Sequence, residues 1–378
     1  MALTEFHTHH FRNLAQQRLQ FSSRVNLIWG RNGSGKSSLL EAIHYLSSGR
    51  SFRTHKHESV VTQGQGGLTV FGRVEREGQS SHQLGVSRDL VQKQTVLKLD
   101  GVRVRSMARL ARELPVSVIE PGTFDILAGG PGKRRQFLDW LVFHVNQDYG
   151  ALWQQYQKGL SQRNHLLRNG TLEGRYRLVW NQELERLAVQ VTEAREGLFR
   201  QFEEALRSLL AEVKVPWSDT LAFQFYPGWD RKRSLSEVLE DHQHQERKAG
   251  YTQYGPHRAD IRVRVHGKPV AEVLSRGQQK TLVVLLKLAQ MACFSNERRL
   301  SGIFLLDDIN AELDDHHQRL LVERLLAMGC PVFVTSIEPP DPRVLWESVM
   351  DELKMFHVEQ GQLTENNIET QGAQEPYS

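Results

Sequence analysis

One segment constrains this chain more than any other: Gly30-Arg31-Asn32-Gly33-Ser34-Gly35-Lys36-Ser37. It fits the phosphate-loop pattern G-x-x-x-x-G-K-[ST] at every fixed position. The apolar stretch 24–29 before it predicts a strand, and apolar residues at helical spacing across 36–46 predict a helix after it. This strand–loop–helix context separates a nucleotide-binding loop from an ordinary glycine-rich turn. The sequence therefore predicts an α/β fold with a nucleotide site.

Each residue type in the loop has a chemical reason. Glycines let backbone N–H groups surround phosphate oxygens, and the following helix points its positive dipole end at the same anion. Lys36 is expected to reach the outer phosphates, and the Ser37 hydroxyl to ligate Mg²⁺. We therefore expect ATP and Mg²⁺ as cofactors. The residues expected to hold ATP are Gly30, Arg31, Asn32, Gly33, Ser34, Gly35, Lys36 and Ser37.

A nucleotide site that hydrolyses ATP needs a further carboxylate, and the segment 302–308 (GIFLLDD) supplies two. Its apolar residues predict a buried strand whose carboxyl end lies beside the phosphate loop. Asp307 is expected to hold Mg²⁺ with Ser37. Asp308 is expected to orient or deprotonate water, which makes Asp308 and Lys36 the catalytic candidates. A buried strand that ends in a turn also attracts aspartate, but the phosphate loop favours the metal interpretation.

The segment 274–280 (LSRGQQK) opens a predicted helix and resembles the LSGGQ signature of ABC-type ATPases. Arg276 replaces the first glycine of that signature. A helix N-terminus attracts anions, and Ser275 is also a simple N-cap residue. The order of the three motifs favours the signature over a simple N-cap, and the resemblance implies that it acts on the ATP of a second subunit. Its candidate residues are Ser275, Arg276, Gly277 and Gln278, and the stretch 311–314 resembles the D-loop of the same class.

Composition excludes several classes of protein. Lys plus Arg number 48 against 44 Asp plus Glu, a net charge of +4 on 378 residues, which permits nucleic-acid binding without arguing for it. The two cysteines, Cys293 and Cys330, lack metal-ligand spacing, so a disulfide scaffold and a cysteine zinc site are excluded. No apolar run approaches the ~18–20 residues of a membrane span, and the first residues do not resemble a secretory signal. We expect a cytoplasmic protein without a membrane partner.

Periodicity gives a coarse map of the remaining chain. Alternating apolar and polar residues across 59–105 predict antiparallel strands, with a hairpin turn at Asp100-Gly101. Helical spacing predicts helices at 107–114, 135–149, 278–294 and 314–328, and a long helical stretch at 178–212 broken at Gly197. The other predicted strands are 116–119, 261–265, 270–273, 331–336 and 354–360.

Further segments accompany the phosphate loop and the signature: 11–14 (FRNL), 40–43 (LEAI), 49–53 (GRSFR), 134–139 (RRQFLD), 255–258 (GPHR), 306–308 and 312–314. In this order along the chain, they resemble the RecF family of ATPases, which are related to SMC and ABC proteins. Three positions depart from the family pattern: Ser38 replaces a common asparagine, Ala259 stands where an acid often follows, and Thr335-Ser336 stand where ABC transporters carry a switch histidine.

The resemblance implies an ABC-type ATPase lobe, a mixed sheet with flanking helices, built from residues 1–130 and 251–360. A helical lobe, 131–250, would be inserted, and the polar, acidic composition of 361–378 predicts a mobile tail. It also implies an ATP-dependent homodimer that binds double-stranded and gapped DNA, hydrolyses ATP slowly, and helps RecO and RecR load RecA. The phosphate loop and Ser275 would lie at opposite edges of one lobe. The alternative is an ABC-transporter-type ATPase subunit, which the helical insert, Arg276 and the missing histidine disfavour.

Two groups of basic residues are candidates for DNA contact. Lys133, Arg134 and Arg135 open a predicted helix, where positive charge opposes the helix dipole and an external anion would compensate. Salt bridges within the protein are the alternative. Arg258 follows a Gly-Pro turn, where a structural role and a functional contact are equally compatible with the sequence. His7, His9 and His10 are interpreted as a surface strand rather than a metal site.

Overall fold

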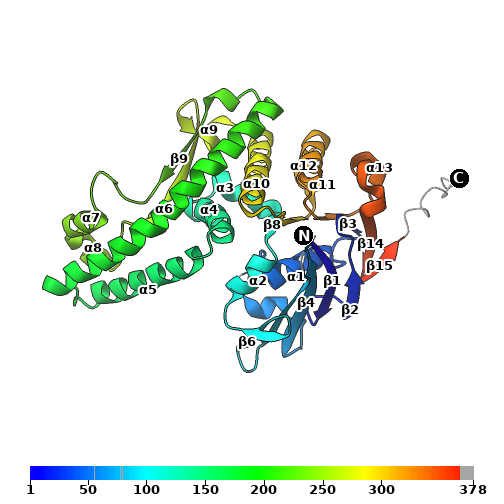
Figure 1. Ribbon diagram of the computed structural model, residues 1–378, viewed down its shortest axis with the longest axis horizontal. Coiled ribbons are helices and arrows are strands. Elements are labelled where there is room, and N and C mark those ends of the chain that lie inside the picture. Colours follow the sequence, from blue (N-terminus) through cyan, green and yellow to red (C-terminus); the bar gives the residue numbers. More distant parts are fainter. Residues whose placement is uncertain (55, 77, 79, 367–378) are drawn as a thin grey trace. The chain divides into compact units, whose positions relative to one another are not determined.

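The computed structural model describes residues 1–366 except 55, 77 and 79 (Figure 1). Contacts divide the chain into two compact units. The first contains Met1–Thr123 and the described residues from Arg299 onwards, and the second is Phe124–Arg298. The expected domains assigned 251–298 to the ATPase lobe, whereas this segment packs within the second unit. The cause is α10 (Arg276–Arg298), which contacts α6 (Gly174–Val213) and α4 (Pro131–Val145).

A sheet with the order β15-β14-β3-β13-β12-β8 carries the phosphate loop of the first unit. All neighbouring strands are parallel except β15, which pairs antiparallel with β14. The central strands are runs of apolar residues because a parallel sheet is covered on both faces. The strands are β3 (Val25–Trp29), β8 (Val116–Ile119), β12 (Ile303–Leu306), β13 (Val332–Ser336), β14 (Leu353–Glu359) and β15 (Gln362–Asn366).

The last of these strands corrects one expectation. Residues 362–366, predicted as the start of a mobile tail, form β15 and pair with β14. The remainder of the expected tail, 367–378, lies outside the described residues. The polar sequence of β15 misleads because it is an edge strand, in which only Leu363 is buried.

The second sheet of this unit has the order β2-β1-β4-β5-β6-β7 and is antiparallel throughout. The hairpin predicted at Asp100-Gly101 is confirmed, because both residues have positive φ (53° and 78°) between β6 and β7. The strands are β1 (Ala2–His9), β2 (Gln17–Gln20), β4 (Gly67–Glu75), β5 (His82–Asp89), β6 (Gln94–Leu99) and β7 (Val102–Val104).

Helix α1 (Lys36–Ser48) contacts both sheets, and its Leu39, Ile43 and Leu46 belong to the core cluster that the two sheets share. The helix ends at Gly49, which has a φ of 65° and donates its N–H to Tyr45. The other helices of this unit are η1 (His57–Val60), α2 (Met107–Glu113), η2 (Pro121–Phe124, which continues into the second unit), α11 (Ile309–Glu312), α12 (Asp315–Ala327), α13 (Pro342–Leu345) and η5 (Glu347–Glu352).

The second unit is mostly helical. Helix α6 and its neighbour α5 (Tyr149–Arg168) lie side by side (Figure 1). The break predicted at Gly197 is wrong, since α6 runs through it: buried Phe199 and Phe202 on the same helix outweigh the ~1 kcal/mol that glycine costs. Its remaining elements are α3 (Asp125–Ala128), η3 (Ser218–Thr220), β9 (Leu221–Tyr226), α7 (Leu235–Asp241), α8 (Gln243–Ala249), η4 (Pro256–Arg258), β10 (Asp260–Val265), β11 (Lys268–Pro269) and α9 (Val270–Val273).

The strand predicted at 270–273 is also wrong, because these residues form the short helix α9. The strand before it, β11, has two residues and ends at Pro269. Proline has no N–H to donate to a ladder, so pairing with β10 stops there. The β-branched Val270 and Val273 favour a strand by propensity, but their spacing of three residues places both on one face of a helical turn.

Candidate nucleotide site

The phosphate loop joins β3 to α1 and depends on glycine for its conformation. Gly30 has a φ of 154°, and a Cβ built on it would lie 2.3 Å from the carbonyl oxygen of Val358. Gly35 has a φ of 124° and directly precedes the helix. Any side chain at these positions would be strained or would clash. The loop is therefore held in the turned conformation that lets backbone N–H groups face an anion.

Lys36 is buried within the loop. Its Nζ donates to the carbonyl oxygens of Gly30 at 2.6 Å and Arg31 at 3.1 Å. Burial lowers the pKa of Lys36, and the nearby carboxylates of Asp308 and Asp307 oppose that shift. Phosphate oxygens offer this ammonium stronger, charge-assisted hydrogen bonds than two neutral carbonyls do. The ammonium is thus placed where a phosphate group would bind most favourably.

Ser37 and Asp307, the two expected Mg²⁺ ligands, are in contact. The Ser37 hydroxyl donates to Oδ1 of Asp307 at 2.8 Å. Burial raises the pKa of Asp307, and hydrogen bonds from Ser37 and Thr335 lower it in part. The pair fits Mg²⁺, which takes oxygen ligands and binds through one or two carboxylates together with substrate phosphates. The described residues contain no group of three or more His, Cys, Asp or Glu side chains that would hold a metal by themselves.

Thr335 organises both acids, and the sequence did not predict this role. Its hydroxyl donates to Oδ1 of Asp307 at 3.0 Å and accepts the backbone N–H of Asp308 at 2.8 Å. Asp308 has left-handed backbone angles (φ 51°, ψ 45°), which few non-glycine residues adopt. Thr335 stands near the end of β13, the strand next to β12. That adjacency in the sheet was the missing signal, because nothing along the chain connects these residues.

A buried carboxylate on α1 is a second feature that the sequence did not predict. Glu41 is fully buried and accepts hydrogen bonds from Nε of Arg12 at 2.9 Å and from Nη2 at 2.7 Å. The Ser51 hydroxyl also donates to it, and Nη1 of Arg53 lies 3.9 Å away. Glu41 therefore joins the segments 11–14 and 49–53 to the helix that begins at Lys36. A glutamate among the apolar residues of one helix was the available sign of a charged partner.

Asn13 makes a similar connection to the loop itself. Its Nδ2 donates to the carbonyl oxygen of Gly33 at 3.0 Å, and its Oδ1 accepts the Ser38 hydroxyl at 2.8 Å. Ser38, a departure from the family pattern, thus has a defined partner. The Phe11–Leu14 segment fixes the phosphate loop through Asn13 and fixes α1 through Arg12.

The signature-like residues open α10 in the second unit, and all four are exposed. The Ser275 N–H donates to Oε1 of Gln278 at 2.9 Å, and the Gln278 N–H donates to Oγ of Ser275 at 3.3 Å. This reciprocal pair is a capping box. The Ser275 oxygen accepts in it, and the hydroxyl proton remains able to donate to a ligand.

The DNA candidates divide into two kinds. Arg134 donates to both carboxylate oxygens of Asp260, at 2.7 and 3.1 Å, and Arg135 donates to the carbonyl oxygen of Ala259 at 2.7 Å. These two arginines support the protein's own structure. Lys133 is exposed, and Arg258 is exposed with its guanidinium over the Tyr251 ring.

Three further expectations concern other residues. His7 and His9 lie on β1, an inner strand whose residues are mostly buried, so the expected surface strand is wrong; both histidines are half-buried, and Nε2 of His7 is 2.9 Å from the carboxylate of Glu5. Cys293 and Cys330 are buried and free. In the part of the chain that the structure describes, no helix has the length and apolarity to cross a bilayer.

Comparisons with known proteins identify the family of this chain. The family described as "RecF/RecN/SMC N terminal domain" matches residues 2–363. The "DNA replication and repair protein RecF" of Marinobacter nauticus is 52% identical, covering 97% of this chain and 100% of the relative. That of Cellvibrio japonicus is 41% identical, covering 96% and 99%.

Solved structures give the same result for the fold. "Structure of the recombination mediator protein RecF-ATP in RecFOR pathway" has a TM-score of 0.85 and 26% identity, covering 97% of this chain and 98% of that chain. An Smc head domain from Pyrococcus furiosus bound to the C-terminal domain of ScpA has a TM-score of 0.55 at 14% identity, covering 97% of each chain, which supports the fold alone. The α/β ATPase fold expected from the sequence is confirmed.

Proposed function

Since this chain belongs to the RecF family, we propose that it is an ATP-dependent DNA-binding protein of replication and recombinational repair. The observation that carries the proposal is the Ser37–Asp307 contact of 2.8 Å beside the buried Lys36. The Lys36 ammonium, which would bind phosphate, thus lies next to Ser37 and Asp307, which would bind Mg²⁺. Relatives carry the name "DNA replication and repair protein RecF", and a related structure contains ATP.

In the proposed mechanism ATP binding drives dimerisation. Lys36 binds the outer phosphates, Ser37 and Asp307 hold Mg²⁺, and the Ser275 hydroxyl of a second copy donates to the same ATP. A ligand that binds the dimer better than the monomer shifts the equilibrium by that difference. The dimer then binds duplex DNA at gaps or at junctions with single strands. RecO and RecR are the proposed partners in loading RecA.

Hydrolysis is proposed to release the complex slowly. ABC transporters usually place glutamate after the metal-binding aspartate, and here that residue is Asp308. Its side chain is one methylene shorter, and misplacing a reacting group by ~1 Å can cost about 10²-fold in rate. A slow ATPase suits a switch that must stay bound to DNA for longer than one rapid turnover.

Two measurements test the proposed function. Electrophoretic mobility of duplex, gapped and single-stranded DNA with ATP, ADP or neither should show ATP-dependent binding that is strongest on gapped or duplex DNA. Lys36→Ala should lose about 1.5–3 kcal/mol of ATP binding, the contribution of one charge-assisted phosphate contact. Wild-type ATP affinity in that variant, or DNA binding that ignores nucleotide, contradicts the proposal.

A further inference from the structure

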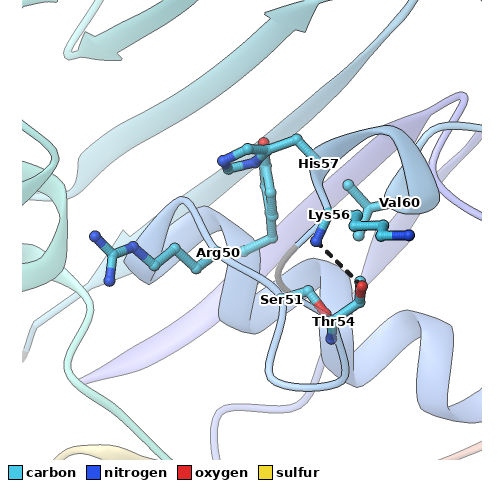
Figure 2. Close-up of a pocket in the computed structure, with 7 residues that line it drawn as sticks. Arg50, Ser51, Thr54, Lys56, His57 and Val60 are labelled. Atoms are coloured by element: carbon cyan, nitrogen blue, oxygen red, sulfur yellow. Dashed lines mark hydrogen bonds between the residues drawn. The ribbon is translucent and has the colours of Figure 1, made fainter. Parts of the chain in front are cut away.

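A basic pocket lies beside the second half of α1, in the loop that leads to η1. Its volume is about 260 Å³, and Arg50, Ser51, Thr54, Lys56, His57 and Val60 line it (Figure 2). Ser51 is the partner of Glu41 described above, and Arg50 belongs to the same 49–53 segment. We propose that this pocket binds the phosphodiester backbone of DNA. The inference rests on the proposed DNA-binding function and adds contact residues to it.

Charge supports an anionic ligand. Residues 50–60 carry Arg50, Arg53 and Lys56 against one carboxylate, Glu58. Arg53 lies beside the buried Glu41, but neither the Arg50 guanidinium nor the Lys56 ammonium has an ion-pair partner among the residues that the structure describes. Both side chains are exposed. Two cations without a carboxylate partner favour a ligand that brings negative charge.

Two hydroxyl groups accept backbone N–H groups of this loop. The Ser51 hydroxyl donates to Glu41 and accepts the N–H groups of Arg53 and Thr54, each at 2.9 Å. The Thr54 hydroxyl accepts the Lys56 N–H at 3.1 Å, the bond drawn in Figure 2. These hydrogen bonds order the backbone N–H groups of Arg53, Thr54 and Lys56 before a ligand arrives, which lowers the entropic cost of binding.

The directions of the basic side chains favour a polymer over a small anion. In Figure 2 the Arg50 and Lys56 side chains extend to opposite sides of the pocket. Cations that diverge do not enclose one phosphate ion. They match a ligand with many phosphates, and each DNA strand carries one per ~3.4 Å of helix axis. Inorganic phosphate is therefore expected to bind weakly here, and a DNA strand to bind across the pocket.

The test compares two double variants of the full-length protein. Arg50→Ala with Lys56→Ala removes both cations of the pocket. Lys98→Ala with Arg103→Ala removes two exposed cations that face each other across β6 and β7 of the same unit, and serves as the matched control. Fluorescence anisotropy with labelled duplex DNA and Mg-ATP gives the association constant K for DNA, and log K is plotted against the logarithm of the salt concentration. The pocket variant should lose about 2 in that slope, because each lost phosphate contact reduces it by ~0.9.

The expected result includes unchanged ATP affinity and unchanged thermal unfolding in both variants, and a smaller slope change in the control. A wild-type slope in the pocket variant overturns the inference. An equal loss in the control also overturns it, since only net charge would then matter. Inorganic phosphate at matched ionic strength is a further check. If it displaces DNA from wild type but not from the pocket variant, the pocket binds small anions and the inference of a DNA site is overturned. If wild-type protein binds no DNA, the proposed function itself fails.

Discussion

Replacing Glu41 by glutamine tests whether its carboxylate holds the segments around the nucleotide site together. The carboxylate is fully enclosed, whereas the Arg12 side chain keeps 22% of its exposure. Removing one partner of a buried ion pair costs about 3–5 kcal/mol. Since water still reaches Arg12, we expect the lower end, about 3 kcal/mol of unfolding free energy. The glutamine amide also turns a donor towards Arg12, which breaks one bond of the bidentate pair.

Urea unfolding of wild type, Glu41→Gln, Arg12→Gln and the double variant measures the coupling. Residues in direct contact show interaction energies of about 0.5–3 kcal/mol. We expect the double variant to be less destabilised than the sum of the single variants, because each single change leaves a charged or polar group without its partner. Hydrogen exchange should quicken at 51–54, whose Ser51 loses its acceptor. A loss below about 0.5 kcal/mol in Glu41→Gln, or strict additivity, refutes the reasoning.

Three further predictions concern residues of the nucleotide site and of the proposed dimer. Burial raises the pKa of Asp307, so the folded protein keeps the carboxyl proton at pH values where the unfolded chain has lost it. As pH rises from 3.8 through the raised pKa of the folded state, wild type should therefore lose unfolding free energy relative to Asp307→Asn. Urea unfolding of both proteins across that pH range measures the difference. Asp308→Asn should keep ATP affinity and lower turnover by about 10²-fold or more; unchanged turnover excludes a role in hydrolysis. Ser275→Arg should bind ATP as a monomer yet fail to dimerise with Mg-ATP, and normal dimerisation in sedimentation velocity would contradict the action of Ser275 on a second subunit.

The sequence predicted those parts of the site whose causes are local. The strand, loop and helix around 30–37 follow from glycine spacing and apolar periodicity within one short window. The turn at Asp100-Gly101, outside the site, is equally local. Asp307 was found because a buried parallel strand places its last residue at the edge of the sheet where ligands bind.

Features that depend on tertiary neighbours were missed. Thr335 acts on Asp307 and Asp308 because β13 pairs with β12, and no spacing rule relates residues so far apart. Glu41 links segments only because Arg12 and Ser51, which lie elsewhere in the chain, donate hydrogen bonds to its carboxylate. The same dependence explains the errors in secondary structure. Propensity penalises glycine within α6 and permits a strand at α9, but packing and pairing set both outcomes.

The Ser275 cap shows how a structural and a functional interpretation can hold for one residue. The sequence left a choice between an N-cap and a signature residue that binds phosphate. In the structure Ser275 caps α10 with Gln278, so the structural role is present. A hydroxyl accepts through its lone pairs and donates through its proton, so capping uses the first and leaves the second for a phosphate oxygen. The cap also fixes the direction of that oxygen at the helix N-terminus, where the backbone dipole favours negative charge. The structural role is therefore compatible with the proposed contact between Ser275 and a phosphate oxygen.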